Sequence, residues 1–434
     1  MIAVLLAAMV LTCTAARETV VIDLDPGGLV WTGLDVDDDL ALLLGIALNR
    51  SNTISLSGIT ICGGNAPLKH TSPGFDLLMN IAGVSPSDFH PHGVARGYGW
   101  RDMHVAWPNF RRLHRLSPDE PSSEDAAHLI IRAARASAVR GLTVVTLGPV
   151  TNLAAALSKA PDIAPRLRRV VLMGGELTGS KMCLNFMSDR AAARAVLASP
   201  VPKLLIPIQL CAQAAFTAAD VRRLEARCGC VASSAAPAAA CALVRKMSLQ
   251  THLMPRLVNP YVRPKLPASS RWTPSERLAD GFIPWDVIAM LAAFRPDGIF
   301  SSWDAHRVFV PPCERAADVE PCEGTLTFDT VPIRTRVGEA AMGDSPYHTG
   351  ADIEGYAEGE AGAEAHRNVA LVPHQLSEAA LIDSTIDLLC SVPAVGDAHS
   401  ALLLGYVWEA GLLAIGTLCA LVAGMRAWWR FAFV

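Results

Sequence analysis

The chain has 434 residues and a nearly balanced charge, with 37 Lys and Arg against 41 Asp and Glu. This balance argues against a nucleic-acid-binding protein, because binding to phosphates requires clustered basic side chains. Hydrophobic residues make up 51% of the chain, which is enough apolar surface to exclude disorder as the main state. We therefore predict a folded protein with no nucleic-acid partner.

The first 17 residues resemble a secretory signal peptide. An apolar run at 2–11 is followed by small residues and then by Arg17, which is the order of a hydrophobic region and a cleavage zone. The basic residues that usually come before the apolar run are missing. We predict that residues 1–17 are a cleaved signal peptide; the alternative is an extension that leads into the first strand.

Residues 401–425 are predicted to form a transmembrane helix. This stretch contains one charged residue, Glu409, and is followed by a short basic and aromatic tail at 426–434. About 20 apolar residues span a bilayer, and Arg with Trp at one flank is typical of the cytosolic interface. We expect a single-pass membrane protein of the secretory pathway, with residues 18–395 lumenal or extracellular. A buried C-terminal helix is the alternative.

Between these ends, β-branched apolar runs alternate with Ala- and Leu-rich segments of helical length. This alternation predicts an α/β fold with an open, mostly parallel sheet flanked by helices. Helix caps are expected at Thr151 or Asn152, at Asp189, and at Thr217 with Asp220. The expected strands are 19–24, 54–61, 142–147, 170–173 and 203–208, and the expected helices are 40–48, 125–137, 152–160, 190–199 and 285–293. No linker divides the pattern, so we predict one domain at 18–395 with insertions at 231–272 and 355–365.

The chain contains 11 cysteines at irregular spacing. Such spacing is not typical of a disulfide framework. Cys228 and Cys230 are a weak indication of zinc or redox chemistry, and Cys313 with Cys322 could close a small loop. The cysteines by themselves leave the cellular compartment undecided.

Acidic residues gather at the end of the first predicted strand. Asp23 and Asp25 end this strand, and residues 35–39, Asp-Val-Asp-Asp-Asp, come directly before the next helix. Ligands of open parallel sheets bind beyond the carboxyl ends of the strands. A helix dipole stabilises each acid by less than about 1 kcal/mol, which is too little to offset their mutual repulsion. We therefore predict a hard cation such as Ca²⁺ or Mg²⁺ here; the alternative is a set of solvated capping acids.

Five blocks of sequence together form a recognisable pattern. They are Asp23-Leu24-Asp25-Pro26-Gly27 with residues 35–42, residues 58–68, residues 147–154 with 169–175, Asn185 with Asp189, and residues 285–289. In type and in order these blocks resemble the inosine-uridine-preferring nucleoside hydrolase family over about residues 19–390. The resemblance implies a nucleoside hydrolase-like α/β fold. It also implies hydrolysis of the N-glycosidic bond of ribonucleosides, a small-molecule substrate, to free base and ribose.

The resemblance further implies a calcium site and a general base. Asp25, Asp38 and Asp286 would bind Ca²⁺ through their side chains, and Leu147 through its main-chain carbonyl. Asp37 would be the catalytic base that takes a proton from a water held by the ion. A shift by one residue, with Asp38 as base and Asp39 as ligand, is the alternative assignment.

The substrate-binding residues follow from the same resemblance. Asn65 and Asn185 would hold ribose hydroxyls, and Met173 would line the sugar pocket, with simple core packing as its alternative. Trp285 precedes Asp286 as in the purine-specific branch of the family, and would stack on a purine base. Trp100 is the candidate for the second aromatic wall.

Three departures from the family pattern concern the pocket rather than the metal ligands. The loop at 26–36 is longer than usual, Cys183 stands where a glutamate usually contacts the ribose 5′-hydroxyl, and Ser180 is near an expected asparagine. The 5′ end of the pocket is therefore altered.

These departures leave alternative functions open. One is a catalytically inactive, membrane-anchored protein that binds nucleosides or ribose. Another is an aspartate phosphotransferase, which the missing partner lysine disfavours. The natural substrate is not fixed by the sequence, and a homo-oligomer is compatible with it.

Overall fold

The computed structural model describes residues 17–26, 36–65, 68–85, 88, 93–96, 125–175, 183–230, 238–257, 259, 273–309, 327–328 and 369–394. The predicted transmembrane helix at 401–425 and all but the last residue of the predicted signal peptide lie outside these residues. Within the described ranges, no helix has the length and apolar character needed to cross a membrane.

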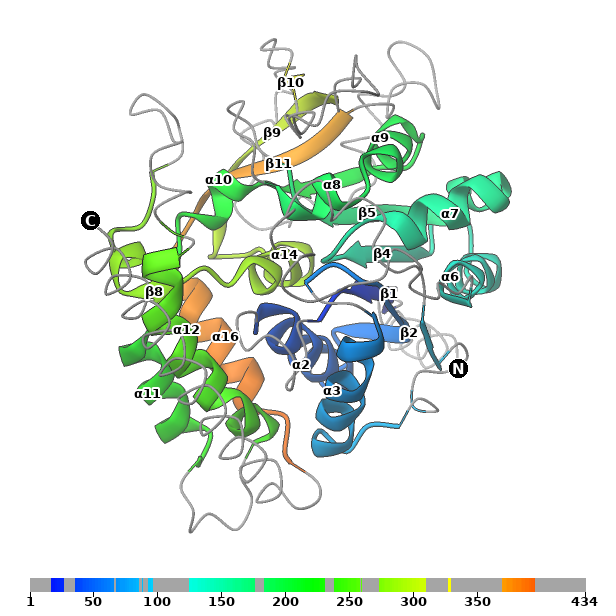
Figure 1. The fold of residues 1–434 in the computed structure, drawn as a ribbon. Helices are drawn as coiled ribbons and strands as arrows, with labels where there is room; N and C mark the ends of the chain where they lie inside the picture. Colours follow the sequence, from blue (N-terminus) through cyan, green and yellow to red (C-terminus); the bar gives the residue numbers. More distant parts are fainter. Residues whose placement is uncertain are drawn as a thin grey trace, which may run out of the picture.

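A mostly parallel sheet forms the centre of the molecule (Figure 1). In the described part of the chain the strand order is β10-β9-β11-β6-β5-β4-β1-β2-β3. The strands from β11 to β3 are parallel, and β9 and β10 pair antiparallel at one edge. The strands are β1 (Glu18–Leu24), β2 (Ile54–Ile61), β3 (Gly93–Arg96), β4 (Leu142–Thr146), β5 (Leu167–Met173), β6 (Lys203–Ile206), β9 (Phe300–Phe309), β10 (Thr327–Phe328) and β11 (Val369–Leu376). The predicted open, mostly parallel sheet is confirmed.

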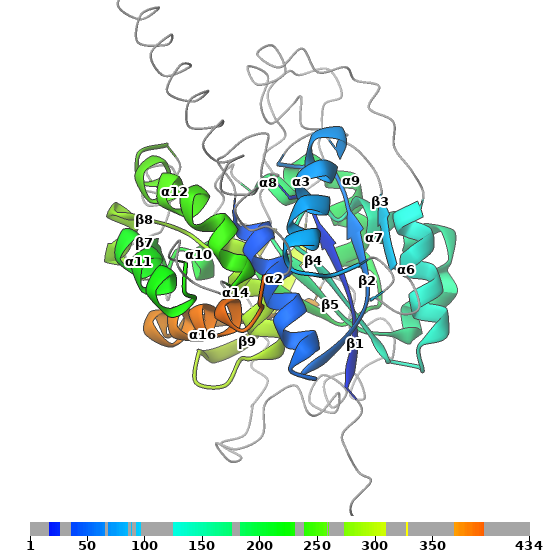
Figure 2. The ribbon, with the colours of Figure 1, turned by 90° about the horizontal axis from the view of Figure 1, so that it is seen from below.

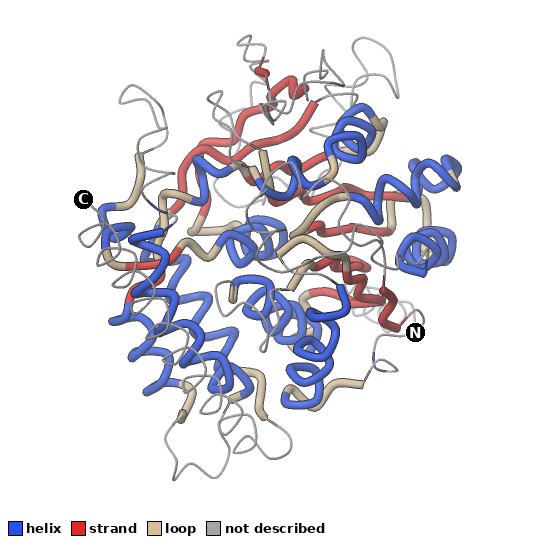
Figure 3. Tube along the Cα trace, viewed as in Figure 1, coloured by secondary structure: helices blue, strands red, loops and turns tan. Residues whose placement is uncertain are grey.

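Helices cover both faces of this sheet, as Figures 1 and 2 show in two orthogonal views. Helices α2 and α14 lie on one face and α6 and α7 on the other, so that the strands run between two helical layers (Figure 3). The helices are α2 (Asp37–Arg50), α3 (Leu68–Ile81), α6 (Asp125–Ala136), α7 (Thr151–Lys159), α8 (Leu184–Ser188), α9 (Arg190–Ala198), α10 (Ile208–Cys211), α11 (Ala218–Arg227), α12 (Val244–Leu257), α14 (Trp285–Phe294) and α16 (Glu378–Cys390). Short 3-10 turns are η3 (Pro161–Arg166), η4 (Ala239–Leu243) and η6 (Glu276–Ala279), and β7 (Phe216–Thr217) pairs with β8 (Gly281–Phe282).

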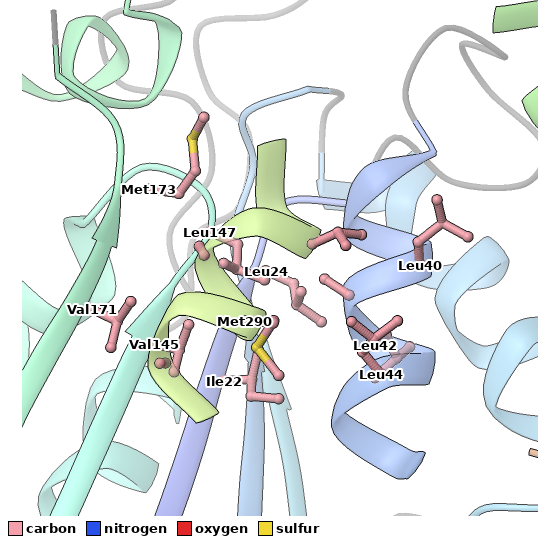
Figure 4. Packing of buried hydrophobic residues seen from close by; sticks show 14 of the residues in the cluster. Ile22, Leu24, Leu40, Leu42, Leu44, Val145, Leu147, Val171, Met173 and Met290 are labelled. Carbon is pink, nitrogen blue, oxygen red and sulfur yellow. The ribbon is translucent and has the colours of Figure 1, made fainter. Parts of the chain in front are cut away.

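The strand sequences explain why both faces must be covered. Ile22, Val145 and Val171 are fully buried on β1, β4 and β5, and such β-branched runs are typical of a parallel sheet with helices on both sides. Figure 4 shows Ile22 beside Met290 of α14. Gly45 of α2 permits this packing, because a Cβ atom there would lie 2.6 Å from Cδ1 of Ile22. The core therefore depends on a close approach of α2 to β1.

The predicted helix caps are partly confirmed. Asp189 caps α9 by accepting a hydrogen bond from the backbone N–H of Ala192, and Asp220 accepts one from the N–H of Thr217. The cap predicted at Thr151 or Asn152 is wrong, because α7 begins at Thr151 with Val150 at its N-cap. Both side chains are used elsewhere: Thr151 donates to Asp189, and Asn152 donates to Asp23.

Two disulfides correct the interpretation of the cysteines. Cys228 is bonded to Cys390 and Cys230 to Cys241, so the Cys228–Cys230 pair is not a zinc or redox motif. The pairing was hidden because Cys390 is 162 residues from Cys228 and becomes its neighbour only when α16 packs beside α11. Part of the predicted insertion at 231–272 also folds into the domain, as η4 and α12.

The strand order reverses between β1 and β4. From the neighbours β1 and β4, the chain continues outward in opposite directions, to β2 and β3 on one side and to β5 and β6 on the other. Ligands of doubly wound sheets bind where the strand order reverses in this way, beyond the carboxyl ends of the strands. The acidic residues that follow β1 stand at this position.

Candidate active site

Two helix N-termini bring the acidic residues together beyond β1. Helix α2 begins at Asp37 rather than at the predicted residue 40, so its first turn contains Asp37, Asp38 and Asp39. Helix α14 begins at Trp285, so Asp286 lies in its first turn. The positive ends of both helix dipoles stabilise these carboxylates. All four acidic side chains are nevertheless buried, where charge is costly unless it is compensated.

Asp37, Asp38 and Asp286 converge on one point. Their carboxylates each offer an oxygen within 4.8 Å of the others, and each residue is at most 3% exposed. The backbone N–H of Asp286 donates a long hydrogen bond of 3.4 Å to Oδ2 of Asp37, which ties α14 to α2. Three buried oxygen donors at this spacing suit a hard divalent cation.

Asp25, a predicted ligand, is not one of these three converging carboxylates but is linked to them by hydrogen bonds with Asp38 and Asn65. The N–H of Asp25 donates to Oδ1 of Asp38 at 3.1 Å, and the N–H of Asn65 donates to Oδ2 of Asp25 at 2.9 Å. The side-chain amide of Asn65 donates to Oδ2 of Asp38 at 3.0 Å. A carboxylate has about four acceptor positions, so these contacts orient Asp25 and Asp38 and leave them able to bind a cation.

Two glycines make room for the Asp25 carboxylate. A Cβ atom at Gly64 would lie 1.9 Å from Oδ2 of Asp25, and one at Gly148 would lie 2.2 Å from Oδ1. Any side chain at either position would displace the carboxylate. The glycines therefore belong to the site, although they have no side chain that could contact a ligand.

Asp39 faces away from this cluster. Its Oδ2 accepts an ion-paired hydrogen bond of 2.7 Å from Nζ of Lys246 on α12. The converging carboxylates are thus Asp37, Asp38 and Asp286, whereas Asp39 is engaged elsewhere. Lys246 was missed from the sequence because it lies 207 residues from Asp39, in a segment interpreted as an insertion.

Asn185, Leu147 and Met173, of which Asn185 and Met173 are predicted to contact the sugar, lie together. The Asn185 amide donates to the carbonyl oxygens of Leu147 at 2.5 Å and of Met173 at 3.1 Å. Met173 is 7% exposed, and the Cys183 thiol accepts a hydrogen bond from the N–H of Gly175 at 2.8 Å. The carbonyl predicted as a metal ligand therefore adjoins the amide predicted to bind ribose.

Of the two tryptophans predicted to stack on the base, only Trp285 is among the described residues. Trp285 is partly buried and packs against the hydrophobic core next to Asp286. Trp100, Ser180 and most of the long loop at 26–36 lie outside the described residues. The predicted stacking role of Trp285 remains a prediction.

Asp23 lies beneath the cluster and was not assigned a role. Burial raises the pKa of its carboxyl group from 3.8 to about 6, although hydrogen bonds from Thr60 and Asn152 act in the opposite direction. These donors contact Oδ1 at 2.6 and 2.8 Å, while Oδ2 has no hydrogen-bond partner among the described residues. Asp23 therefore ties β1 to β2 and α7 directly below Asp25.

Two buried thiols also border the cluster. Burial and then the charge of Asp23 raise the pKa of Cys62 well above its usual value; burial and then the charge of Asp37 do the same for Cys211. Both thiols stay protonated at neutral pH, so they add no further negative charge to the floor of the site.

The sequence of this chain matches a known family model. The model for inosine-uridine preferring nucleoside hydrolases matches residues 20–347. The chain belongs to this nucleoside hydrolase family. The resemblance inferred from the motifs is thereby confirmed.

Two related proteins match this chain over part of their sequences. An uncharacterized protein of Schizosaccharomyces pombe is 28% identical over 222 residues, 48% of this chain and 66% of the relative. The pyrimidine-specific ribonucleoside hydrolase RihB of Escherichia coli O157:H7 is 28% identical over 220 residues, 48% of this chain and 65% of RihB. The chain thus covers slightly less than two thirds of these relatives.

Solved structures of other nucleoside hydrolases share the fold. A plant nucleoside hydrolase is 16% identical with a TM-score of 0.55, covering 86% of this chain and 99% of that chain. A purine-preferring ribonucleoside hydrolase from Gardnerella vaginalis is 18% identical with a TM-score of 0.52, covering 86% and 99%. These likenesses support the nucleoside hydrolase-like fold.

The raised pKa of Asp23 predicts a pH-dependent stability in the metal-free protein. Folding raises this pKa from 3.8 to about 6. The protonated carboxyl therefore contributes its full stabilisation below about pH 4, and this contribution is lost as the pH rises through about 6. Asp23→Asn stays uncharged and keeps an acceptor for Thr60 and Asn152. We expect its free energy of unfolding, relative to the wild type, to rise from about pH 4 to about pH 7 by up to about 3 kcal/mol.

Urea unfolding at a series of pH values, in the presence of chelator, measures this difference. Asp162→Asn is the control, because Asp162 is exposed and its hydrogen bond with Arg135 lowers its pKa. The free energy of unfolding of Asp162→Asn, relative to the wild type, should fall as the pH rises. A flat profile for Asp23→Asn would show that its carboxyl stays ionised in the folded state.

Proposed function

We propose that the chain hydrolyses the N-glycosidic bond of ribonucleosides to free base and ribose. The observation that carries this proposal is the buried group of Asp37, Asp38 and Asp286, with oxygens within 4.8 Å of one another at the point where the strand order reverses. Membership of the nucleoside hydrolase family supports the same reaction.

The residues present fit a calcium ion, which is the proposed cofactor. Asp25, Asp38 and Asp286 offer carboxylates and Leu147 offers a carbonyl oxygen, a set of hard donors that Ca²⁺ prefers. When bound, the ion would orient water and ribose hydroxyls and make deprotonation of water easier. The buried negative charge that this ion would neutralise supports the assignment.

Asp37 is the proposed general base. Its carboxylate is 3% exposed, and the N–H of Asp286 contacts Oδ2, which restricts the orientation of the side chain. A buried, oriented carboxylate is suited to take a proton from the attacking water. The glycosidic bond then breaks through an oxocarbenium-like state, whose positive charge the neighbouring aspartates stabilise.

The sugar would be held by amides on two sides of the carboxylate group. Asn65 and Asn185 both stand at the carboxyl ends of strands, after β2 and beyond β5, and both donate hydrogen bonds within the site. Proposed contacts run from these amides to ribose hydroxyls and from Met173 to the sugar ring. Holding the sugar fixed relative to Asp37 lowers the entropic cost of the reaction.

A protein that binds nucleosides without turnover is the second candidate. The observation in its favour is Cys183, whose thiol accepts a hydrogen bond from Gly175 at the position where a glutamate contact to the ribose 5′-hydroxyl is usual in the family. The complete set of Asp25, Asp37, Asp38 and Asp286 argues against it.

Replacement of the base separates the two candidates. Asp37→Asn keeps the shape of the side chain but removes its ability to accept a proton, so kcat should fall by at least about 100-fold with little change in nucleoside affinity. Release of free ribose from a panel of nucleosides measures turnover, and calorimetry measures binding. Asp162→Asn, an exposed position, should leave both unchanged. Wild-type binding without ribose release would instead favour the inactive binding protein.

We further propose a preference for purine nucleosides. Trp285 stands directly before Asp286 at the start of α14, where an indole can stack on a large base and favour its protonated form. A leaving base stabilised in this way needs no dedicated protein acid. The names of the relatives include both base preferences, so this proposal depends on the Trp285 side chain.

The purine proposal predicts that the effect of Trp285→Ala depends on the leaving group. Turnover of inosine should fall by about 10-fold or more, because stacking contributes about 1–2 kcal/mol. Turnover of nitrophenyl riboside, whose leaving group is already activated, should be nearly unchanged. Steady-state kinetics on both substrates and on uridine measure the effect. Equal losses on both substrates, or a wild type faster on uridine than on inosine, would contradict the stacking argument.

We propose that the domain lies in the secretory pathway, lumenal or extracellular, on a membrane-anchored chain. The disulfides Cys228–Cys390 and Cys230–Cys241 support this location, because disulfides persist in oxidising compartments.

Protease treatment of sealed vesicles tests this location. Protease added on the cytosolic side should leave the domain intact, and the four disulfide cysteines should resist alkylation without prior reduction. Digestion of the whole domain from the cytosolic side, or four reactive thiols at these positions, would contradict the proposal.

A further inference from the structure

A buried ion pair adjoins the proposed cation site. Nζ of Lys246 on α12 lies 2.7 Å from Oδ2 of Asp39, and the two side chains are 8% and 1% exposed. Removing both charges from water carries a large desolvation penalty, so such a pair is weak evidence for stability. Its position next to the carboxylate cluster suggests a different role.

Asp39 carries a charge that the proposed cation would otherwise meet. It follows Asp38 in the first turn of α2, and consecutive Cα atoms are about 3.8 Å apart. Successive side chains on a helix point in directions about 100° apart, so Asp39 can face α12 while Asp37 and Asp38 face the cluster. Figure 2 shows α12 beside the N-terminal end of α2.

We propose that Lys246 is a positioning residue that keeps Asp39 out of the cation site and cancels its charge. The first turn of α2 then presents two carboxylates to the cluster, those of Asp37 and Asp38, instead of three. This inference rests on the proposed function, because it concerns the cation that the cluster would hold.

The two charges of this ion pair should act on a bound cation in opposite directions. Removing the Lys246 charge takes one positive charge away from the buried site, and a more negative surrounding at short range strengthens cation binding. Removing the Asp39 charge takes one negative charge away and weakens cation binding. The two single variants should therefore change Ca²⁺ affinity in opposite directions, and the double variant should approach the wild type.

Isothermal calorimetry with Ca²⁺ on the full chain tests the direction in which each variant changes the Ca²⁺ affinity. We expect Lys246→Gln to lower the Kd by about tenfold and Asp39→Asn to raise it by about tenfold. The double variant should lie within about threefold of the wild type, and Lys246→Arg, which keeps the charge, within about twofold. In Lys246→Gln, kcat should fall more than KM changes, because the added negative charge opposes deprotonation of water.

Lys203→Gln is a matched control at the opposite end of the sheet. Lys203 is also buried, and its ammonium donates to the carbonyls of Ser199 and Val201 at 2.7 Å each. Losing it should lower the melting temperature without changing the Kd for Ca²⁺. Melting curves of all variants show which are folded, and Lys246→Arg and Asp39→Asn keep the test intact if Lys246→Gln does not fold.

The outcomes separate the two proposals. Suppose that the wild type binds Ca²⁺. If both Lys246→Gln and Asp39→Asn then weaken binding, or if neither variant changes it, Lys246 is a structural residue and the inference is wrong. If the wild type shows no binding to Ca²⁺, the proposed function fails first, and the inference fails with it.

Discussion

The site depends on holding several buried carboxylates together against their mutual repulsion. The protein compensates them locally: the N-termini of α2 and α14 point at the cluster, and backbone N–H groups of Asp25, Asn65 and Asp286 donate to carboxylate oxygens. These contacts orient the acids without neutralising them. The proposed cation would neutralise the remaining charge, and in this way the fold and the proposed chemistry are connected.

Close packing is the second requirement, and it explains the small residues around β1. Gly64 and Gly148 leave space for the Asp25 carboxylate, and Gly45 lets α2 approach Ile22 of β1. The acidic first turn of α2 reaches the end of β1 only because that approach is short. The positions of the carboxylates therefore depend on the packing of the core.

The sequence predicted what depends on local pattern. The alternation of strand and helix patterns predicted the sheet, and the acidic residues at the end of β1 predicted the cluster. Both patterns lie within short segments of the chain. It did not predict Lys246 or the bond between Cys228 and Cys390, because these partners lie 207 and 162 residues apart and meet only through packing. The cap expected at Asn152 failed for the same reason, since that side chain binds Asp23.

The two ends of the proposed substrate site rest on different kinds of residues. The cation end is built from backbone groups and side chains joined by hydrogen bonds across β1, α2 and α14, so a substitution there disturbs several contacts at once. The base end depends on single aromatic side chains such as Trp285, which packs at a helix start. Among the described residues, the Trp285 side chain makes no hydrogen bond to the carboxylates, so the proposed base end and the cation end can vary separately. In the proposal made above, the base preference of this chain therefore depends on Trp285, which stands directly before Asp286 at the start of α14.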